Sequence, residues 1–246
     1  MAFGRREFLT ALGAVATMAA EVPTRTPVLV ELFTSQGCSS CPPADSLLAR
    51  LVEEQPVAGA EIIGLSQHVD YWNRLGWKDP YSSAANTERQ VRYQRQFRTE
   101  SVYTQLMVVN GRREFLGSDA KKALEAIRVQ AAQPRVGLEL EASGGMARIA
   151  VSAGDLRNAD LLVALVQREA GNPVSRGENQ GRTLRHRNVL NHLGKALLRP
   201  DGGGGKAVYR LPPLPSGQPA DWRVVAFLQD RASLAILGAT VAPYAK

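Results

Sequence analysis

An apolar run that leads directly into a closely spaced pair of cysteines constrains this chain more than any other feature. Residues 27–33 read PVLVELF, a nearly continuous apolar stretch that is typical of a buried strand. A Thr-Ser-Gln-Gly turn follows, then CSSCPP with Cys38 and Cys41, and leucines recur at helical spacing over residues 44–54. The sequence therefore predicts a strand, a tight turn, and a helix that starts at the cysteine pair.

The next hundred residues alternate between strand-like and helix-like segments. We expect strands at 61–66, 106–109 and 114–116, and helices at 82–98 and 119–130. The last two strands flank Asn110-Gly111, which is a strong hairpin signal. This β-α-β-α-β-β-α order is that of the thioredoxin fold, which we expect over residues 26–131.

The pattern changes at Gln133-Pro134. Beyond it, short alternating apolar runs are separated by Gly, Asn and Pro, at 136–141, 147–152, 160–169, 207–211, 223–230 and 235–241. Strands of this length and spacing predict an antiparallel β-sandwich over residues 134–243. The expected fold class is thus an α/β thioredoxin-like domain followed by an all-β domain.

The first twenty residues have the layout of an export signal. Arg5 and Arg6 precede a weakly apolar stretch that ends in small residues near Ala20, the pattern of a twin-arginine signal. The alternative is a short amphipathic helix of the folded domain. An export signal predicts a periplasmic or secreted protein, in a compartment where disulfides persist. The longest apolar run lies in this segment and falls short of the ~18 residues of a membrane helix, so we expect no membrane span in the mature chain.

Composition excludes several classes of protein. Hydrophobic residues make up 44% of the chain, which excludes wholesale disorder. The formal charge of +7 is spread along the sequence without basic runs or interleaved aromatics, so we expect no nucleic-acid partner. Two cysteines are too few for a disulfide framework, and three histidines are too few for a histidine-rich metal store.

The cysteine pair has three interpretations, of which redox exchange is preferred. Unpaired backbone N–H groups and the helix dipole at the start of a helix stabilise a thiolate. Cys38 would then be the exposed nucleophile and Cys41 the thiol that resolves the mixed disulfide. No organic cofactor is needed, because the dithiol carries two electrons. The expected function is an exported thiol–disulfide oxidoreductase acting on exported proteins or small thiols, together with a redox partner protein.

A structural disulfide and a metal pair are the alternatives. A four-residue ring stabilises by only about 2 kcal/mol, against about 3 kcal/mol for a fifteen-residue ring, which argues against a purely structural role. Two thiolates at this spacing can bind Cu(I), with His68 as a further ligand, whereas a closed zinc site needs four ligands. A periplasmic Cu(I)-handling protein and a non-catalytic binding module therefore remain as alternative functions.

Glu31 lies inside the apolar strand that leads to the cysteines. Pointing inward, it would be a desolvated carboxylate able to relay the proton of Cys41 through water. Pointing outward, it would simply face solvent. The residues alone do not choose between these two orientations.

Several segments carry a family resemblance that covers most of the mature chain. They are VELFTSQGCSSCPPAD at 30–45, QHVDYW at 67–72, VYT at 102–104 with MVVNG at 107–111, and RGENQGRTL at 176–184. In these segments the chain resembles an exported bacterial thioredoxin-like family catalogued as domain of unknown function 1223. The resemblance implies a thioredoxin-like domain followed by a β-rich domain, and no settled substrate.

A more distant similarity to the thioredoxin active-site region concerns the loop before the third strand. Glu31 matches the buried acid of that region, and Gln105 takes the place of its cis-proline. Because a non-proline cis bond costs ~3 kcal/mol, we expect a trans bond between Thr104 and Gln105. A trans bond would strengthen the copper alternative, with redox exchange still preferred. Thr104 and Gln105, with Ser39 and Ser40, are the expected substrate contacts.

Two further polar segments each have a functional and a structural interpretation. The HVDYW segment follows the second strand, so His68 lies where ligands gather at the carboxyl ends of strands. Packing of the loop by its aromatic residues is the preferred interpretation. Residues 176–182, with His186 and Asn188, would either hold a peptide or anion through Arg176, Glu178 and Arg182 or form a structural loop. The structural loop is preferred.

Overall fold

The computed structural model describes residues 25–246, and the expected export signal at 1–20 lies outside this range. The first part of the described chain consists of β1 (Thr26–Thr34), α1 (Pro42–Glu54), β2 (Ala60–His68), the short 3-10 helix η1 (Asn73–Leu75), α2 (Ala84–Phe97), β3 (Leu106–Val109), β4 (Arg113–Leu116) and α3 (Ala120–Ala131). The second part consists of β5 (Leu138–Ser143), β6 (Met146–Val151), β7 (Ala159–Pro173), β8 (Thr183–Ala196), β9 (Arg199–Asp201), β10 (Gly204–Arg210), η2 (Pro219–Asp221), β11 (Trp222–Asp230) and β12 (Ile236–Pro243). Within residues 25–246, no helix has the length and apolar character needed to cross a bilayer.

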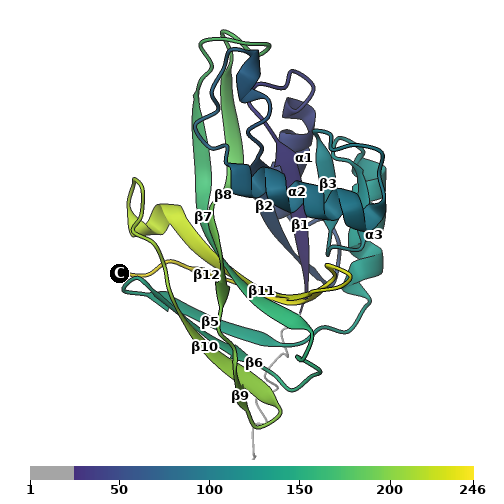
Figure 1. Ribbon diagram of the computed structural model, residues 1–246, viewed down its shortest axis with the longest axis vertical. Helices are drawn as coiled ribbons and strands as arrows, with labels where there is room; N and C mark the ends of the chain where they lie inside the picture. Colours follow the sequence, from purple (N-terminus) through teal and green to yellow (C-terminus); the bar gives the residue numbers. More distant parts are fainter. Residues whose placement is uncertain (1–24) are drawn as a thin grey trace, which may run out of the picture.

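One eight-stranded sheet, in the order β12-β11-β7-β8-β2-β1-β3-β4, runs through both parts of the chain (Figure 1). β1 pairs in parallel with β2, and β3 pairs antiparallel to β1 and to β4. β8 joins the two parts through a parallel pairing of Val189 with Ser66 of β2. The boundary expected near residues 131–134 falls between α3 and β5, and strands from both sides of it share this sheet.

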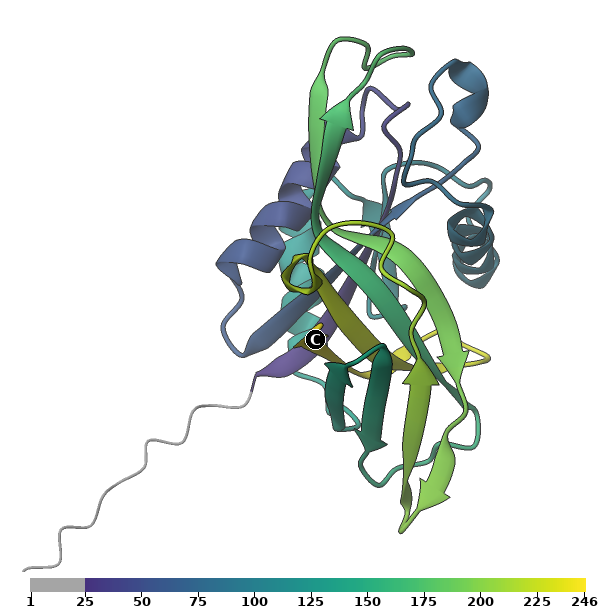
Figure 2. The same ribbon diagram turned by 90° about the vertical axis from the view of Figure 1, so that its left-hand side faces the viewer.

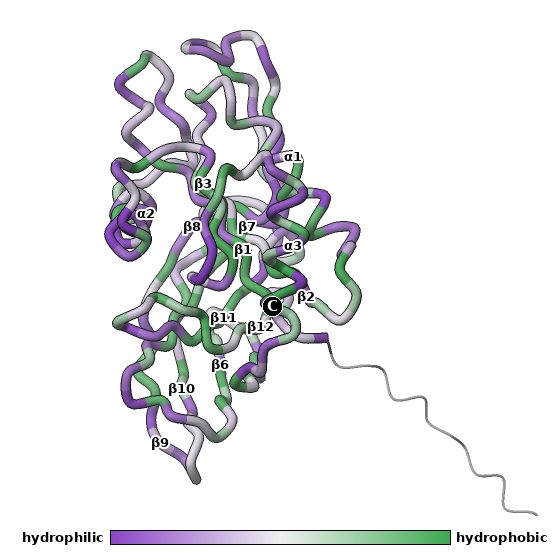
Figure 3. The backbone as a smooth tube through the Cα atoms, turned by 90° about the vertical axis from the view of Figure 1, so that its right-hand side faces the viewer, coloured by the Kyte–Doolittle hydropathy of each residue, from purple (hydrophilic) through white to green (hydrophobic). Residues whose placement is uncertain are grey.

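β1 is buried on both faces, as its apolar run predicts. Val28, Val30 and Leu32 pack with α1 and α3 in one core. On the opposite face, Phe33 packs edge-on against Tyr93 of α2, with ring centroids 6.0 Å apart. Figure 3 shows the hydrophobic residues concentrated on such central strands. Burial on both faces fixes β1 firmly, so the end of the strand is a rigid base for the turn that follows.

The hairpin predicted at Asn110-Gly111 is confirmed. Asn110 and Gly111 have positive φ angles, 49° and 62°, but Val109 pairs with Arg113, so the connection has three residues, 110–112, rather than two. A Cβ atom on Gly111 would overlap the backbone oxygen of Leu234, so this position requires glycine for space as well as for conformation. The turn therefore also sets how closely β3 and β4 approach the loop before β12.

A second, four-stranded sheet in the order β5-β6-β10-β9 covers the lower part of the large sheet (Figure 2). Its side chains, such as Ile149, pack in one apolar core with Leu161 and Val163 of β7 and with Val224 of β11. Trp222 is fully buried in the same core. This core anchors one end of β7 and β8.

β7 and β8 form a long hairpin that extends from this core to the end of the molecule that carries the cysteines (Figure 2). The expectation of a loop that includes His186 and Asn188 is wrong, because both residues lie on β8. His186 and Asn188 are buried, whereas Arg185 is exposed. The inward positions of this part of β8 therefore carry polar residues, and the alternation of apolar and polar residues that predicts a strand is missing. Residues 174–182, called the tip loop below, connect the two strands.

Candidate functional site

Cys38 and Cys41 form a disulfide between the end of β1 and the start of α1. Cys41 is the N-cap residue of α1, and Pro42 and Pro43 follow in the first turn. The carbonyl of Cys41 accepts hydrogen bonds from the N–H groups of Ala44 (2.9 Å) and Asp45 (3.2 Å), which begin the helix. The predicted strand–turn–helix placement of the pair is confirmed, and proline suits a first turn whose N–H groups lack helical partners.

Hydroxyl groups surround the Cys38 sulfur. Thr104 Oγ1 donates to Cys38 Sγ at 3.3 Å, and Ser40 Oγ lies 3.3 Å from the same sulfur. Trp72 Nε1 donates to Thr104 Oγ1 at 3.0 Å. Because an indole N–H only donates, the Thr104 hydroxyl accepts from Trp72 and directs its own proton at the sulfur. A donor held in this way would stabilise negative charge on Cys38.

The peptide bond between Thr104 and Gln105 is cis, so the expectation of a trans bond is wrong. The Gln105 side-chain amide donates to the carbonyl of Ser40, within the turn between the cysteines. The expectation of a trans bond came from the general energetic preference for trans. The contact between Gln105 and Ser40 depends on the folded loop and is not visible in the sequence. Thr104 and Gln105 thus lie beside the cysteine turn, and their role as substrate contacts stays a prediction.

Both sulfur-bearing residues are covered. Cys38 and Cys41 have 0% exposure, whereas Ser39 and Ser40 between them are exposed. The prediction that Cys38 is an exposed nucleophile is therefore wrong for this conformation. The physical reason is that segments far along the chain close over the turn, and sequence spacing gives no sign of them.

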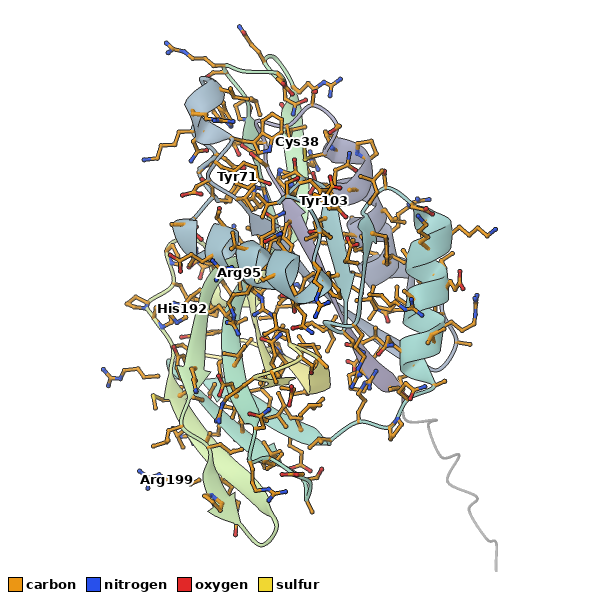
Figure 4. All side chains as sticks on the ribbon, turned by 45° about the vertical axis from the view of Figure 1, so that its right-hand side comes forward. Cys38, Tyr71, Arg95, Tyr103, His192 and Arg199 are labelled. Atoms are coloured by element: carbon orange, nitrogen blue, oxygen red, sulfur yellow. A yellow bond between two sulfur atoms is a disulfide. The ribbon has the colours of Figure 1, made fainter. Side chains whose placement is uncertain are left out.

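The tip loop is one of these segments, and it binds the backbone of the cysteine turn. Asn179 Nδ2 donates to the carbonyls of Gln36 and Cys38, both at 2.9 Å. Glu178 Oε2 accepts the N–H of Ser39 at 2.9 Å, and this hydrogen bond holds the pKa of the Glu178 carboxyl below its ordinary value. Asn179 is buried, but Glu178 is exposed. Figure 4 shows Cys38 at the end of the molecule that the β7–β8 hairpin reaches.

The loop after β2, residues 69–79, covers the turn from another direction. A Cβ atom on Gly37 would lie 3.3 Å from Cβ of Trp72, so Trp72 packs directly on the cysteine turn. Trp77 Nε1 donates to Gln36 Oε1 at 3.1 Å, and a Cβ atom on Gly177 would lie 3.2 Å from Cβ of Trp77. The loop therefore contacts both the cysteine turn and the tip loop, in agreement with the packing interpretation of HVDYW.

His68 belongs to a buried polar network rather than to the cysteine sulfurs. His68 Nδ1 lies 2.7 Å from Asp79 Oδ2, which also accepts the N–H of Gln36 at 2.8 Å. The ring of His186 lies edge-to-face with that of His68, with centroids 4.5 Å apart. Burial by itself would raise the pKa of Asp79, but His68 and the backbone donors hold it below its ordinary value.

The proton of His186 is placed by its neighbours. Because Trp77 donates to Gln36 Oε1, the Gln36 Nε2 group must donate, and His186 Nε2, 3.2 Å away, accepts. The ring proton is then on Nδ1, which lies 3.4 Å from Asp45 Oδ1. Asp45 is buried one helical turn after Cys41, and its other oxygen accepts the Thr34 hydroxyl at 3.1 Å. We did not single out Asp45 from the sequence, although its spacing from Cys41 was the available signal.

The residues expected for copper do not meet in this conformation. The sulfurs of Cys38 and Cys41 are bonded to each other, and Nδ1 of His68 is held by Asp79. Between residues 25 and 246, no group of three or more His, Cys, Asp or Glu side chains is arranged to hold a metal ion. A copper site at this pair would require reduced cysteines and another arrangement of His68.

Glu31 points inward, but toward α2 rather than toward the cysteines. Its carboxylate accepts from Arg89 Nε at 2.6 Å, from the Tyr93 hydroxyl at 2.5 Å and from Gln67 Nε2 at 2.7 Å. Adjacent residues of a strand face opposite sides, and α1 packs on the side of Val30 and not of Glu31. The structure therefore does not place Glu31 next to Cys41, as the expected proton relay would require.

Comparison with known proteins identifies the family. The profile of the family described as "Protein of unknown function (DUF1223)" matches residues 29–229. The chain belongs to this family. This match confirms the family, DUF1223, that the sequence segments indicated. Comparison with curated proteins gives no match.

Two solved structures are similar to this DUF1223 protein. Protein AGR_C_4864 from Agrobacterium tumefaciens is 31% identical, with a TM-score of 0.70, over 88% of this chain and 94% of that chain. HBP35 of Porphyromonas gingivalis is 15% identical, with a TM-score of 0.56, over 89% of this chain and 76% of that chain. The second likeness shows the fold alone.

Proposed function

We propose that this DUF1223 protein is an exported thiol–disulfide exchange protein in which Cys38 and Cys41 alternate between dithiol and disulfide. The observation that carries the proposal is the pair of hydroxyls, from Thr104 and Ser40, 3.3 Å from the Cys38 sulfur. A disulfide that only fastened two segments would gain little from hydrogen-bond donors at one sulfur. A thiolate formed at Cys38 during exchange would be stabilised by them.

The arrangement of β2, β1, β3 and β4, with α1 and α3 on one face, supports a thioredoxin-like description of this half. In that description the cysteines lie at the junction of the central strand and its helix, where the N-terminus of α1 favours a negative sulfur. The export assignment rests on the sequence pattern at residues 1–20 and on the persistence of disulfides outside the cytoplasm.

The exchange proceeds in two steps. The Cys38 thiolate attacks a substrate disulfide, a bond forms between Cys38 and one substrate sulfur, and the other substrate sulfur leaves as a thiolate. The Cys41 thiolate then attacks Cys38, the protein disulfide forms, and the second substrate thiolate leaves. Two electrons pass from the dithiol to the substrate, and the two thiol protons end on the substrate sulfurs. The reverse sequence oxidises a substrate.

The covered sulfurs require an opening step before either reaction. Release of the tip loop would break the hydrogen bonds from Asn179 and the one to Glu178, and it would free the backbone of the cysteine turn on both sides of Cys38. Asp45, on the face of α1 that also carries Cys41, takes the proton-transfer role that we expected of Glu31.

Trapping of a mixed disulfide tests this proposal. The reduced Cys41→Ser variant should form a stable mixed disulfide with a scrambled, disulfide-containing protein, because the resolving thiol is absent. The Cys38→Ser variant is the matched control and should form none. Equal trapping by both variants, or trapping by neither, would contradict the assigned roles.

The zero exposure of the sulfurs favours a second candidate, a non-catalytic binding module whose disulfide fixes the turn. On that account, neither single-cysteine variant traps a substrate, and the wild-type disulfide resists reduction until the protein unfolds. The two candidates therefore predict opposite results in the same experiment.

A further inference from the structure

A carboxylate of the chain itself is already hydrogen-bonded to the backbone next to the reactive cysteine. Glu178 Oε2 accepts the N–H of Ser39, the residue that directly follows Cys38, at 2.9 Å. Glu178 comes from the tip loop, 139 residues further along the chain, and its side chain is otherwise exposed. The Ser39 N–H is thus a donor that a carboxylate from a separate molecule can also use once the tip loop moves.

The surface around this position carries an excess of positive charge. The exposed cations of the two covering loops are Arg74, Lys78, Arg176 and Arg182. Among residues 25–246, none of these four makes a salt bridge.

The acids of the same loops are already bound. Asp79 is buried against His68, and Asp70 Oδ1 accepts the Thr87 hydroxyl at 2.6 Å. Glu178 is held by Ser39. Displacement of Glu178 from Ser39 would therefore leave a vacant backbone donor next to loops in which four exposed cations outnumber three acids. The loops at this end of the molecule are rich in hydrophilic residues (Figure 3).

We propose that Glu178 is a built-in competitor for a carboxylate of the substrate, and that the protein exchanges preferentially with anionic disulfides. This inference rests on the proposed exchange function and names its substrate class. An acidic group close to the substrate sulfur takes the Ser39 N–H, Glu178 leaves with the tip loop, and Cys38 becomes accessible. Before the tip loop moves, the exposed arginines of the two covering loops attract the same substrate at longer range.

The test uses the reduced full-length protein and three small disulfides of similar size. They are dithiodipropionate, which is anionic, hydroxyethyl disulfide, which is neutral, and cystamine, which is cationic. The second-order rate of protein oxidation is measured with each, at low and high salt. Intrinsic reactivity of the disulfides cancels when each variant is compared with the wild type on the same compound.

Removal of the competing charge by Glu178→Gln keeps an oxygen that can accept the Ser39 N–H. We expect the ratio of the anionic to the cationic rate to rise, by up to about tenfold, the effect of one hydrogen bond to a charged group. Arg74→Glu and Arg176→Glu should lower that ratio several-fold at low salt, with a smaller effect at high salt. The exposed Arg199→Glu and Arg210→Glu variants, on β9 and β10 of the four-stranded sheet, are the charge-matched controls and should leave it unchanged.

The outcomes separate this inference from the exchange function. Oxidation by all three disulfides, with a ratio that neither Glu178→Gln nor the Arg74 and Arg176 variants alter, would refute the substrate class alone. An equal effect of the control variants would show that only the overall charge of the protein matters, and would also refute it. No reaction with any of the three disulfides would refute exchange itself, and the substrate class with it.

Discussion

Replacement of Asn179 by alanine tests whether the tip loop controls access to the disulfide. Asn179 is 1% exposed, and its Nδ2 group donates to the carbonyls of Gln36 and Cys38 at 2.9 Å each. These are the contacts that hold the tip loop on the cysteine turn together with Glu178. Asn179→Ala removes both hydrogen bonds to the cysteine turn, and also the one that Asn179 Oδ1 accepts from Arg182 at 3.0 Å within the tip loop.

The magnitude follows from the two bonds. A typical hydrogen bond contributes about 1 kcal/mol net, so the closed conformation should lose about 2 kcal/mol relative to the open one. The fraction of open molecules then rises about 30-fold, because 1.4 kcal/mol corresponds to a factor of ten. If reduction requires opening, the rate of reduction by a small thiol rises by the same factor.

The assay is the rate of disulfide reduction by excess dithiothreitol, followed by alkylation of the released thiols and mass spectrometry. Gln180→Ala is the matched control, because this neighbouring side chain is exposed and makes no described hydrogen bond to the cysteine turn. Urea unfolding of each variant shows whether global stability has changed. An unchanged reduction rate in Asn179→Ala would refute the covering role of the tip loop.

Three further predictions concern the scaffold. Arg89→Met leaves the buried Glu31 carboxylate without its cation and should lower the free energy of unfolding by about 3–5 kcal/mol in urea titrations, whereas Glu31→Leu with Arg89→Met should recover most of it. Recovery of nothing would contradict the ion-pair account. Gly111→Ala should destabilise by more than 1 kcal/mol, because its Cβ would overlap backbone, and by more than Gly59→Ala, where φ is also positive but space is open. Equal thermal midpoints for these two variants would contradict the packing argument. The pKa of Asp79 is lower in the folded protein, so its stabilisation is complete above the ordinary aspartate value of about 4 and is lost as pH falls through the folded value. Urea unfolding between pH 6 and 3 should show a smaller acid-induced loss for Asp79→Asn than for the wild type, and an identical loss would exclude this residue as its source.

The local elements were predictable because each depends on neighbouring residues. The run PVLVELF and the Asn110-Gly111 turn carry their own signals, and β1 and the β3–β4 hairpin formed where these signals placed them. β8 was missed because His186 and Asn188 fill inward positions that a strand pattern reserves for apolar side chains. For His186, Gln36 supplies a polar partner at Nε2 from the neighbouring cysteine turn.

The cover over the disulfide was not predictable by the same means. It depends on contacts such as the one between Glu178 and Ser39, which no periodicity or spacing reveals. The orientation of Glu31 likewise depends on Arg89, which α2 brings from 58 residues away. The cysteine chemistry could thus be anticipated from short spacings, whereas accessibility and proton transfer depend on the tertiary fold.

The reduction potential of the Cys38–Cys41 pair, measured by equilibrium with glutathione, tests the central claim most directly. An exchange protein needs a pair that equilibrates with small thiols, so the account predicts a potential above about −300 mV, where labile and catalytic disulfides lie. A structural disulfide stays oxidised at more reducing potentials than this. A value well below about −300 mV would contradict the exchange function and leave the disulfide as a fastening of the turn.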